Sequence, residues 1–300
     1  MEIALSIGNF DAVHRGHIAI VEAARRAVGE GHVVIWSFNP SPTAFLHPET
    51  VIEQLTEFSQ RQVLLLQAGA DEVVELAPTV ELMNQSPEVF VSYFVQALSP
   101  QYVVEGEGFR FGKNRKGSLE ELVQLGSNFE FSTIKVPPVE VTMHDQSVHR
   151  ASSSLVRTLI KSGRVEDARN VLGRPVTVSG IVGQGDQRGR LMHFPTANLA
   201  HIQTLLPADG IYAGRGFLED GTSFPAAISI GTKPTFGENE RTCEAHLIGF
   251  EGDQGSYGWK LELSFDHWLR DQIRFDSIED LMKAIQDDVE KATQLLERNT

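Results

Sequence analysis

The sequence predicts an α/β chain. It has a doubly wound parallel sheet in its first half, a small antiparallel β-barrel in its second half and a helix at its C-terminal end. Three observations predict this fold class. Apolar, β-branched runs alternate with helical stretches up to about residue 150, the order of a doubly wound sheet. After Gly173-Arg174-Pro175 the apolar runs become short and are separated by turn residues, as in small barrels. The last stretch, 277–299, carries apolar residues at helical spacing.

Composition and charge restrict the class of protein. A length of 300 residues suggests two domains, and 41% hydrophobic with 22% charged residues is an ordinary globular balance. The net charge of −14 argues against a general nucleic-acid binder. Cys243 is the single cysteine, which excludes an internal disulfide and suits a reducing compartment. The N-terminus lacks a basic segment before an apolar core, and no apolar stretch approaches ~20 residues. We therefore expect a cytoplasmic protein that contacts neither membrane nor nucleic acid; the pattern leaves the oligomeric state open.

The first half opens with a strand–helix–strand unit. Residues 2–7 predict a buried strand, and residues 16–32 carry apolar positions at helical spacing that end at Gly29 and Gly31. Residues 33–38 predict a second strand, which should run parallel to the first through a right-handed crossover. The same order continues with strands at 73–76, 102–105 and 132–136 and with helices at 61–70 and 87–98, the last capped by Ser86.

The second half begins with a helix pair. Residues 152–173 show helical spacing, Ser153 or Ser154 could cap the first helix, and Gly163 interrupts the pattern. Ser277 and Asp280 have capping-box spacing at the start of the final helix. The barrel strands are predicted at 176–182, 211–218, 224–230, 243–250 and 259–265.

The stretch "IGNFDAVHRGH", residues 7–17, follows the first predicted strand. Ligands of open parallel sheets bind beyond the carboxyl ends of the strands. Small residues there allow backbone N–H groups to approach a phosphate, and the helix starting near Gly16 directs its positive end to the same place. His14 and His17 could both donate hydrogen bonds to a triphosphate. The alternative is that His14 only caps the helix and His17 packs on the sheet; the agreement of the two histidines with the strand–helix context favours a phosphate site.

This stretch resembles the H-x-G-H signature of nucleotidyltransferases, in the form found in the bifunctional bacterial riboflavin kinase/FAD synthetase family. The resemblance extends along nearly the whole chain in the family's order and spacing. Its further blocks are "FNPSP" (38–42), "LT" (55–56), "GFRFGKNRKG" (108–117), "SSSLVR" (152–157), "GRP" (173–175), "GQGDQRGR" (183–190), "FPTAN" (194–198), "GIYA" (210–213), "IGTKPTFG" (230–237), "EAHL" (244–247), "LR" (269–270) and "RFDSIEDL" (274–281).

For the first half, the resemblance implies an FMN adenylyltransferase domain over residues 1–155. FMN and ATP would react there to give FAD and pyrophosphate, with the chemistry carried by positioning and charge stabilisation. "SSSLVR" could instead be plain helix capping, and the basic residues of 110–116 could be solvated loop charge. The implied catalytic residues are His14 and His17, the implied nucleotide-binding residues are Gly8, Asn9, Phe10, Arg110, Ser153 and Arg157, and Phe109 with Phe111 could offer a flavin or adenine face.

For the second half, the resemblance implies a helical linker over 156–175 and a riboflavin kinase domain over 176–300. Glu244 would accept the proton of the ribityl hydroxyl. By strand alternation Glu244 shares a face with His246, and that face could be solvent or a site. The implied Mg²⁺ ligands are Thr196 and Asn198, the implied phosphate-loop residues are Gly185, Arg188 and Arg190, and the implied flavin contacts are Arg270 and Phe275.

The sequence departs from the family pattern mainly in the first half. Gly108 removes a side chain where the family carries an acidic or amide residue, and one lost hydrogen bond to a charged group costs ~1.5–3 kcal/mol. Two alternatives therefore stand beside the bifunctional enzyme: a riboflavin kinase whose first domain adenylylates weakly or is repurposed, and a flavin-binding protein without turnover. The other departures are Ala12, Ser41 and Leu155 in the first half and Gln184 and His193 in the second.

Overall fold

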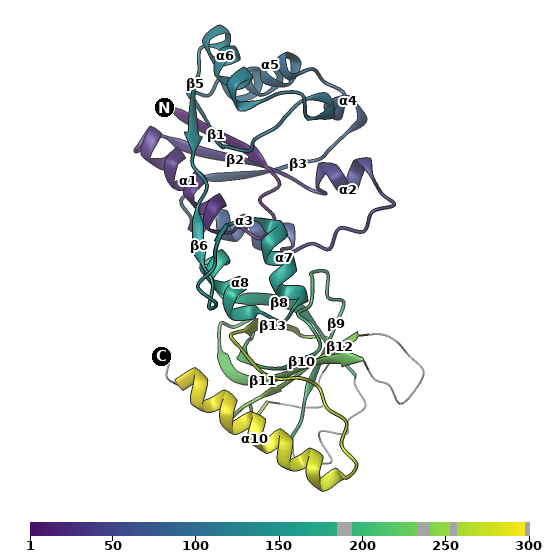
Figure 1. The fold of residues 1–300 in the computed structure, drawn as a ribbon. Helices are drawn as coiled ribbons and strands as arrows, with labels where there is room; N and C mark the ends of the chain where they lie inside the picture. Colours follow the sequence, from purple (N-terminus) through teal and green to yellow (C-terminus); the bar gives the residue numbers. More distant parts are fainter. Residues whose placement is uncertain (185–193, 233–240, 253–256, 298–300) are drawn as a thin grey trace. The chain divides into compact units, whose positions relative to one another are not determined.

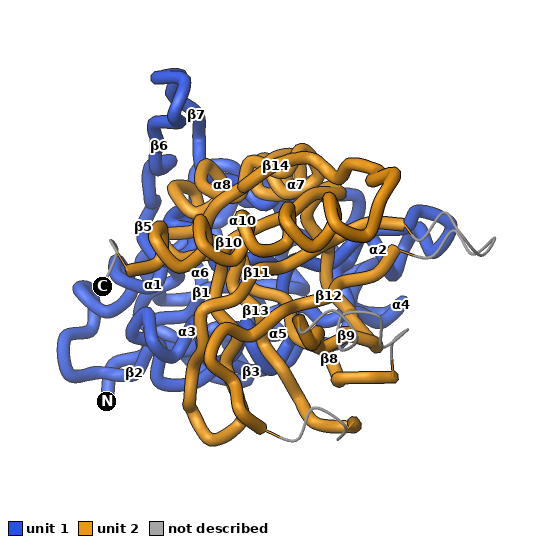
Figure 2. Tube along the Cα trace, turned by 90° about the horizontal axis from the view of Figure 1, so that it is seen from below, with its two compact units in different colours: residues 1–153 blue, residues 154–300 orange. Residues whose placement is uncertain are grey.

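The computed structural model describes residues 1–184, 194–232, 241–252 and 257–297. The chain divides into two compact units, residues 1–153 and residues 154–300 (Figure 2). Each unit has its own sheet and is described by itself below.

The first unit contains a five-stranded parallel sheet of order β3-β2-β1-β4-β5, as the alternation of strands and helices predicted (Figure 1). β1 pairs with β2 over its whole length but with β4 only at Ala4 and Leu5. The order of the sheet shows that the direction of strand addition reverses between β1 and β4. Because these two strands pair only near their amino-terminal ends, they separate toward their carboxyl ends. This is the place where open sheets bind ligands. The strands are β1 (Ile3–Gly8), β2 (His32–Phe38), β3 (Glu72–Leu76), β4 (Tyr102–Gly106) and β5 (Ser132–Val136).

Helices cover both faces of this sheet because the strands are apolar on both sides (Figure 1). Leu5 and Ile7 pack in one core cluster, which includes Phe94 of α5, whereas Ala4 packs on the opposite face with Val21 of α1. The sequence did not predict α2, α4, α6 or the β6–β7 hairpin. The elements are α1 (Arg15–Val28), α2 (Pro42–Leu46), α3 (Phe58–Gln67), α4 (Val80–Met83), α5 (Pro87–Leu98), η1 (Lys113–Arg115), α6 (Leu119–Phe129), β6 (Glu140–Thr142) and β7 (Val148–Arg150).

The second unit begins with the expected helix pair and continues as an antiparallel barrel. Six strands close into a ring in the order β11-β12-β9-β8-β13-β10, because β10 also pairs with β11, and β14 extends the sheet beside β10. β9 and β14 are additional to the predicted strands. The elements are α7 (Ser153–Lys161), α8 (Val165–Leu172), β8 (Val176–Gly183), β9 (Ala197–Ala200), β10 (Gly210–Phe217), β11 (Ser223–Thr232), β12 (Arg241–Leu247), β13 (Lys260–Phe265) and β14 (His267–Arg270).

The final helix, α10 (Ile278–Glu297), packs on the outside of the barrel. Its apolar stripe buries Ala292 and Leu296 against Ala213 of β10. Ser277 caps the helix as predicted, since its Oγ accepts a hydrogen bond from the backbone N–H of Asp280 at 3.1 Å. Among the described residues, no helix is long and apolar enough to cross a membrane.

Candidate active sites

The loop between β1 and α1 has an unusual backbone. Phe10, Ala12 and Val13 have φ angles of 48°, 78° and 43°, in the left-handed region that favours glycine. Such conformations cost an L-residue roughly 1–2 kcal/mol each, and they cluster at functional sites. The loop therefore keeps its shape only because contacts from outside hold it.

His14 ends this loop as the N-cap of α1. Its Nδ1 accepts a hydrogen bond from the backbone N–H of Gly16 at 3.1 Å, which places the proton of the neutral ring on Nε2. The ring of His17 stacks on that of His14, with centroids 3.7 Å apart. A Cβ on residue 16 would lie 3.0 Å from Cε1 of His14, which is tighter than an ordinary contact. Glycine at position 16 therefore leaves room for the His14 ring. Capping and phosphate binding are thus compatible, because the cap bond uses only Nδ1 of His14.

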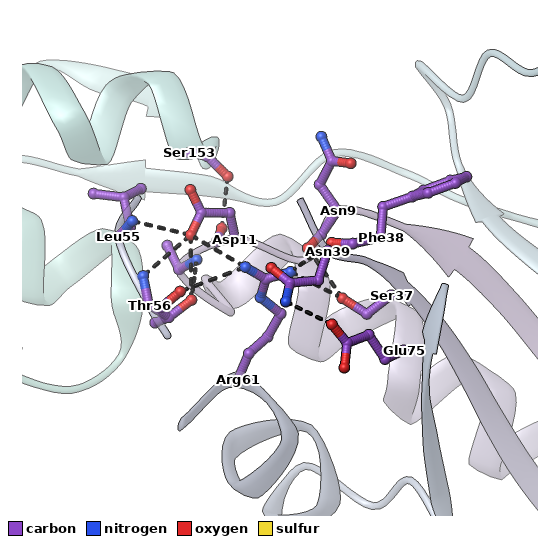
Figure 3. A network of polar contacts seen from close by, with 11 residues as sticks. Asn9, Asp11, Ser37, Phe38, Asn39, Leu55, Thr56, Arg61, Glu75 and Ser153 are labelled. Carbon is purple, nitrogen blue, oxygen red and sulfur yellow. Dashed lines mark hydrogen bonds and ion pairs between the residues drawn. The ribbon is translucent and has the colours of Figure 1, made fainter. Parts of the chain in front are cut away.

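Side chains from distant segments hold the loop in place (Figure 3). One carboxylate oxygen of Asp11 accepts hydrogen bonds from the backbone N–H groups of Leu55 and Thr56, at 3.0 and 3.1 Å. Ser37 Oγ donates to the carbonyl of Asn9 at 3.2 Å, and Ser153 Oγ donates to the carbonyl of Asp11 at 2.7 Å. Ser153 therefore contacts the loop, and its hydroxyl does so by bonding to a backbone carbonyl of the protein.

Phe10 requires a correction. We expected it among the nucleotide-binding residues, but its side chain is buried in the core cluster beneath α1, with its ring 5.1 Å from that of His17. Only its backbone can face a ligand. Gly8 ends β1 and Asn9 is exposed at the start of the loop, where both are available to a phosphate.

The aromatic and basic segment after β4 is only partly available to a ligand. Phe109 and Phe111 stack with centroids 5.4 Å apart, but Phe111 is buried, so only Phe109 could offer a ring face. Arg110 is exposed, and so are Lys113, Arg115 and Lys116, as solvated loop charges would be. Arg157 is half-buried on α7 of the second unit.

Sequence reasoning missed Glu105, a buried carboxyl where β1 and β4 separate. Its Oε1 accepts hydrogen bonds from the backbone N–H of Ile7 at 2.7 Å and from Ser6 Oγ at 3.3 Å. Burial raises the pKa of Glu105 well above its usual value, while the two hydrogen bonds act in the opposite direction. The sequence did contain an indication of this residue, because the apolar run of the predicted strand 102–105 ends in an acidic residue.

In the second unit, Glu244 of β12 lines a cavity of about 600 Å³. Cys243, Ala245 and Leu247 are buried inside the barrel, and Glu244 and His246 share the opposite face, as alternation predicted. That face is the cavity wall rather than open solvent. Thr196 Oγ1 donates to Glu244 Oε2 at 3.4 Å, and Asn198 lies directly across from Glu244 on β9. The three predicted residues, Thr196, Asn198 and Glu244, therefore come together.

Arg270 and Phe275 line the same cavity. The guanidinium of Arg270 lies 5.8 Å from the ring centroid of Phe275, and its Nη2 donates to Asp288 Oδ2 at 2.7 Å. Asp288, a buried acid on α10, was not predicted from the sequence, because helical spacing alone does not distinguish it from the other acids of this helix. The predicted phosphate-loop residues Gly185, Arg188 and Arg190 and the substituted His193 lie outside the described residues.

Together these features define a class of protein: a nucleotide-binding α/β unit followed by a barrel with a carboxylate in its cavity. Family models cover both units, with FAD synthetase matching residues 1–152 and riboflavin kinase matching residues 172–296. The chain belongs to the family of bifunctional riboflavin kinase/FMN adenylyltransferases.

Curated relatives carry that family name. The relative from Pseudomonas fluorescens is 35% identical over 97% of this chain and 92% of its own length. The relative from Listeria monocytogenes is 28% identical over 95% of this chain and 89% of its own length. A crystal structure described as a macrolide-efflux protein from Streptococcus pneumoniae superimposes with a TM-score of 0.86, at 27% identity over 97% of this chain and 94% of that one. That description differs from the names of the curated relatives, and the family assignment rests on the relatives and the family models.

Proposed function

We propose that this chain makes FAD from riboflavin in two ATP-dependent steps, one in each unit. The second unit phosphorylates riboflavin to FMN, and the first unit adenylylates FMN to FAD with release of pyrophosphate. The observation that carries the proposal is the meeting of Glu244 and Thr196 in the wall of a flavin-sized cavity, in the unit that matches the riboflavin kinase model.

In the kinase step, Glu244 accepts the proton of the terminal ribityl hydroxyl as that oxygen attacks the γ-phosphorus of ATP. Thr196 and Asn198 stand beside this carboxylate, where the phosphates must arrive. The apolar wall and Phe275 accommodate the isoalloxazine ring, and Asp288 holds Arg270 against that ring.

The oxygen donors at this site suit Mg²⁺. Thr196, Asn198 and Glu244 offer a hydroxyl, an amide and a carboxylate oxygen, and Mg²⁺ takes few protein ligands beside waters and phosphate oxygens. When bound, Mg²⁺ would neutralise charge on the ATP phosphates. Thr196 and Asn198 are its proposed ligands.

In the adenylylation step, a phosphate oxygen of FMN attacks the α-phosphorus of ATP and pyrophosphate leaves. No protein nucleophile is required, because in-line transfer depends on positioning and charge stabilisation. His14 and the positive end of the α1 dipole stabilise the charge on the phosphate oxygens. A cytoplasmic location belongs to this proposal, since both steps consume ATP and the lone Cys243 is a buried thiol.

The test is chromatography of flavins after purified protein is incubated with ATP and Mg²⁺, once with riboflavin and once with FMN. We expect FMN and FAD from riboflavin, and FAD from FMN. FMN alone from the first tube, with no FAD from the second, would favour a kinase with a silent or repurposed first unit. Absence of product in both tubes would contradict the proposal and favour a flavin-binding protein.

A further inference from the structure

Arg61, on α3, is the most enclosed arginine of the first unit's site, and it does not face a ligand. Its side chain is only 3% exposed. Nη1 donates to Ser37 Oγ at 3.1 Å and to the carbonyl of Phe38 at 2.9 Å. Nη2 donates to the carbonyl of Thr56 at 3.4 Å and lies 3.9 Å from Asp11 Oδ1 (Figure 3). One guanidinium thus connects the end of β2, the segment before α3 and the strained loop.

Two partners of Arg61, Ser37 and Thr56, in turn bond to the loop. Ser37 Oγ donates to the carbonyl of Asn9. Thr56 Oγ1 accepts from the backbone N–H of Ala12 at 3.2 Å and also contacts Asp11 Oδ1 at 3.2 Å. The bonds therefore fix the backbone at residues 9, 11 and 12, which lead directly to the N-cap His14. Arg61 and Thr56 are the two side chains through which these bonds run.

We propose that Arg61 and Thr56 are positioning residues for adenylyl transfer, which hold the 9–13 loop in the shape that presents His14 to phosphate. The inference rests on the proposed function of the first unit. Neither residue touches the reacting atoms, because both side chains are buried behind the loop. They act through Asp11, Ser37 and the loop backbone.

The chemistry of the two side chains explains why these types are needed. Burial lowers the pKa of Arg61, whereas the charges of Asp11 and Glu75 raise it, so the cation is balanced by carboxylates. The planar guanidinium donates to Ser37 and Thr56 from two separate nitrogens in a fixed fork, whereas a lysine ammonium places its donors on one nitrogen at the end of a flexible stem. Thr56 both accepts from Ala12 and donates to Asp11, and a hydroxyl can do both through its single oxygen.

The test uses the full chain with Arg61→Lys, Thr56→Val and Thr56→Ser, assayed for FMN-to-FAD conversion at 10 °C after circular dichroism shows the same folded fraction in each. We expect kcat to fall about 10²-fold in Arg61→Lys, the cost of a small misplacement of reacting groups. We expect a fall of about tenfold in Thr56→Val, the effect of one lost hydrogen bond, with recovery in Thr56→Ser. The KM for ATP should rise in the first two variants, whereas a smaller folded fraction would leave KM unchanged.

Arg25 supplies the matched control in the same unit. It also joins several backbone segments, donating to the carbonyls of Gly29, Gly31 and Gly69 and to Asp71, but at the opposite, amino-terminal end of the sheet. Arg25→Lys should lower the melting temperature without changing kcat or KM for FAD formation. Riboflavin phosphorylation, measured on each sample, should be unchanged in all four variants.

Three results would overturn the inference: unchanged kinetics in Arg61→Lys, equal losses in Arg61→Lys and Arg25→Lys, or equal activity in Thr56→Val and Thr56→Ser. Wild-type FAD formation distinguishes this failure from that of the proposed function. If the wild type converts FMN and the variants match it, only the positioning role is wrong. If the wild type makes no FAD from FMN, the proposed function is wrong and the inference falls with it.

Discussion

The two sites are built in different ways. In the barrel, Glu244 and Thr196 meet because β12 lies beside β9, so strand alternation and register place the side chains. In the α/β unit, the site is a loop whose backbone enters the left-handed region that is costly for ordinary L-residues, and side chains from distant segments hold it. The comparison teaches that the barrel site depends on the identity of the residues that face the ligand. The loop site also depends on residues that never meet it.

The largest expected effect is that of Glu244→Gln, which removes the base but keeps size and hydrogen-bonding capacity. FMN formation from riboflavin should fall by about 10²–10⁴-fold, the usual contribution of general base catalysis. FAD formation from supplied FMN should not change. Initial rates from flavin chromatography measure both steps. The matched control is Glu262→Gln, a barrel carboxylate that bonds Ser179 and does not line the cavity. Kinase activity that survives in Glu244→Gln would remove this residue from its role.

His14→Ala tests the loop site from the ligand side. FAD formation from FMN should fall by about 10²–10³-fold, the cost of losing one preorganised donor to a developing charge. His17→Ala should also reduce it, because the two rings stack. His32→Ala is the control, since His32 starts β2 at the opposite end of the strand and pairs with acids there. Adenylylation that persists in both His14→Ala and His17→Ala would place the phosphate site elsewhere.

Gly108→Asn tests the most serious departure from the family pattern. A Cβ at this position would meet no atom within 4 Å, so the new amide has room. If a polar contact is missing here, the variant should raise kcat/KM for FAD formation by up to about tenfold, the value of one hydrogen bond. Steady-state kinetics with FMN provide the measurement. An unchanged value would show that another residue of this chain compensates.

Glu105→Gln tests the buried carboxyl between β1 and β4. Because the folded-state pKa is raised, the folded unit holds a proton that the unfolded chain releases. The stabilisation is complete below the unfolded pKa and is lost as pH rises through the folded pKa, by at most about 1.4 kcal/mol per pH unit. Chemical denaturation across this range should show the decline in the wild type and not in Glu105→Gln. Parallel pH profiles of the two proteins would contradict the assignment.

The smallest expected effect is that of Ala12→Gly. Ala12 has a φ of 78°, which costs an alanine roughly 1 kcal/mol that a glycine avoids. The unfolded glycine chain gains entropy, so the net increase in the free energy of unfolding should be a few tenths of a kcal/mol. Thermal unfolding measures it. A lower melting temperature would show that the Ala12 methyl contributes packing that outweighs the strain.

The sequence predicted the two faces of β12 correctly for a physical reason. Alternation on one strand fixes which side chains share a face, so Glu244 and His246 could be assigned to one side from the letters alone. The sequence pattern did not show whether that face meets solvent or a cavity. Only the resemblance to the family favoured a site. The five parallel strands followed from equally regular patterns.

The loop site was predicted less completely. The sequence pattern marked His14 and His17 as candidate site residues. It gave no reason to select Arg61, which is one of several polar residues of a predicted helix, or Glu105, which ends an apolar run. The contact of Arg61 with Ser37 joins residues 24 positions apart and that of Glu105 with Ser6 joins residues 99 apart, and no local pattern encodes such pairings. The burial of the Phe10 ring was not predicted either; the residue has a left-handed backbone and its ring lies in the core.

The central claim is that two separate sites in one chain perform consecutive steps, and a mixing experiment tests it most directly. Glu244→Gln and His14→Ala are incubated with riboflavin, ATP and Mg²⁺, each alone and then together, and the flavins are separated by chromatography. The account predicts at most a trace of FAD from either variant alone, FMN from His14→Ala, and FAD from the mixture at a far higher rate than from either variant. A mixture that yields no FAD, while wild-type protein yields it under the same conditions, would contradict the claim.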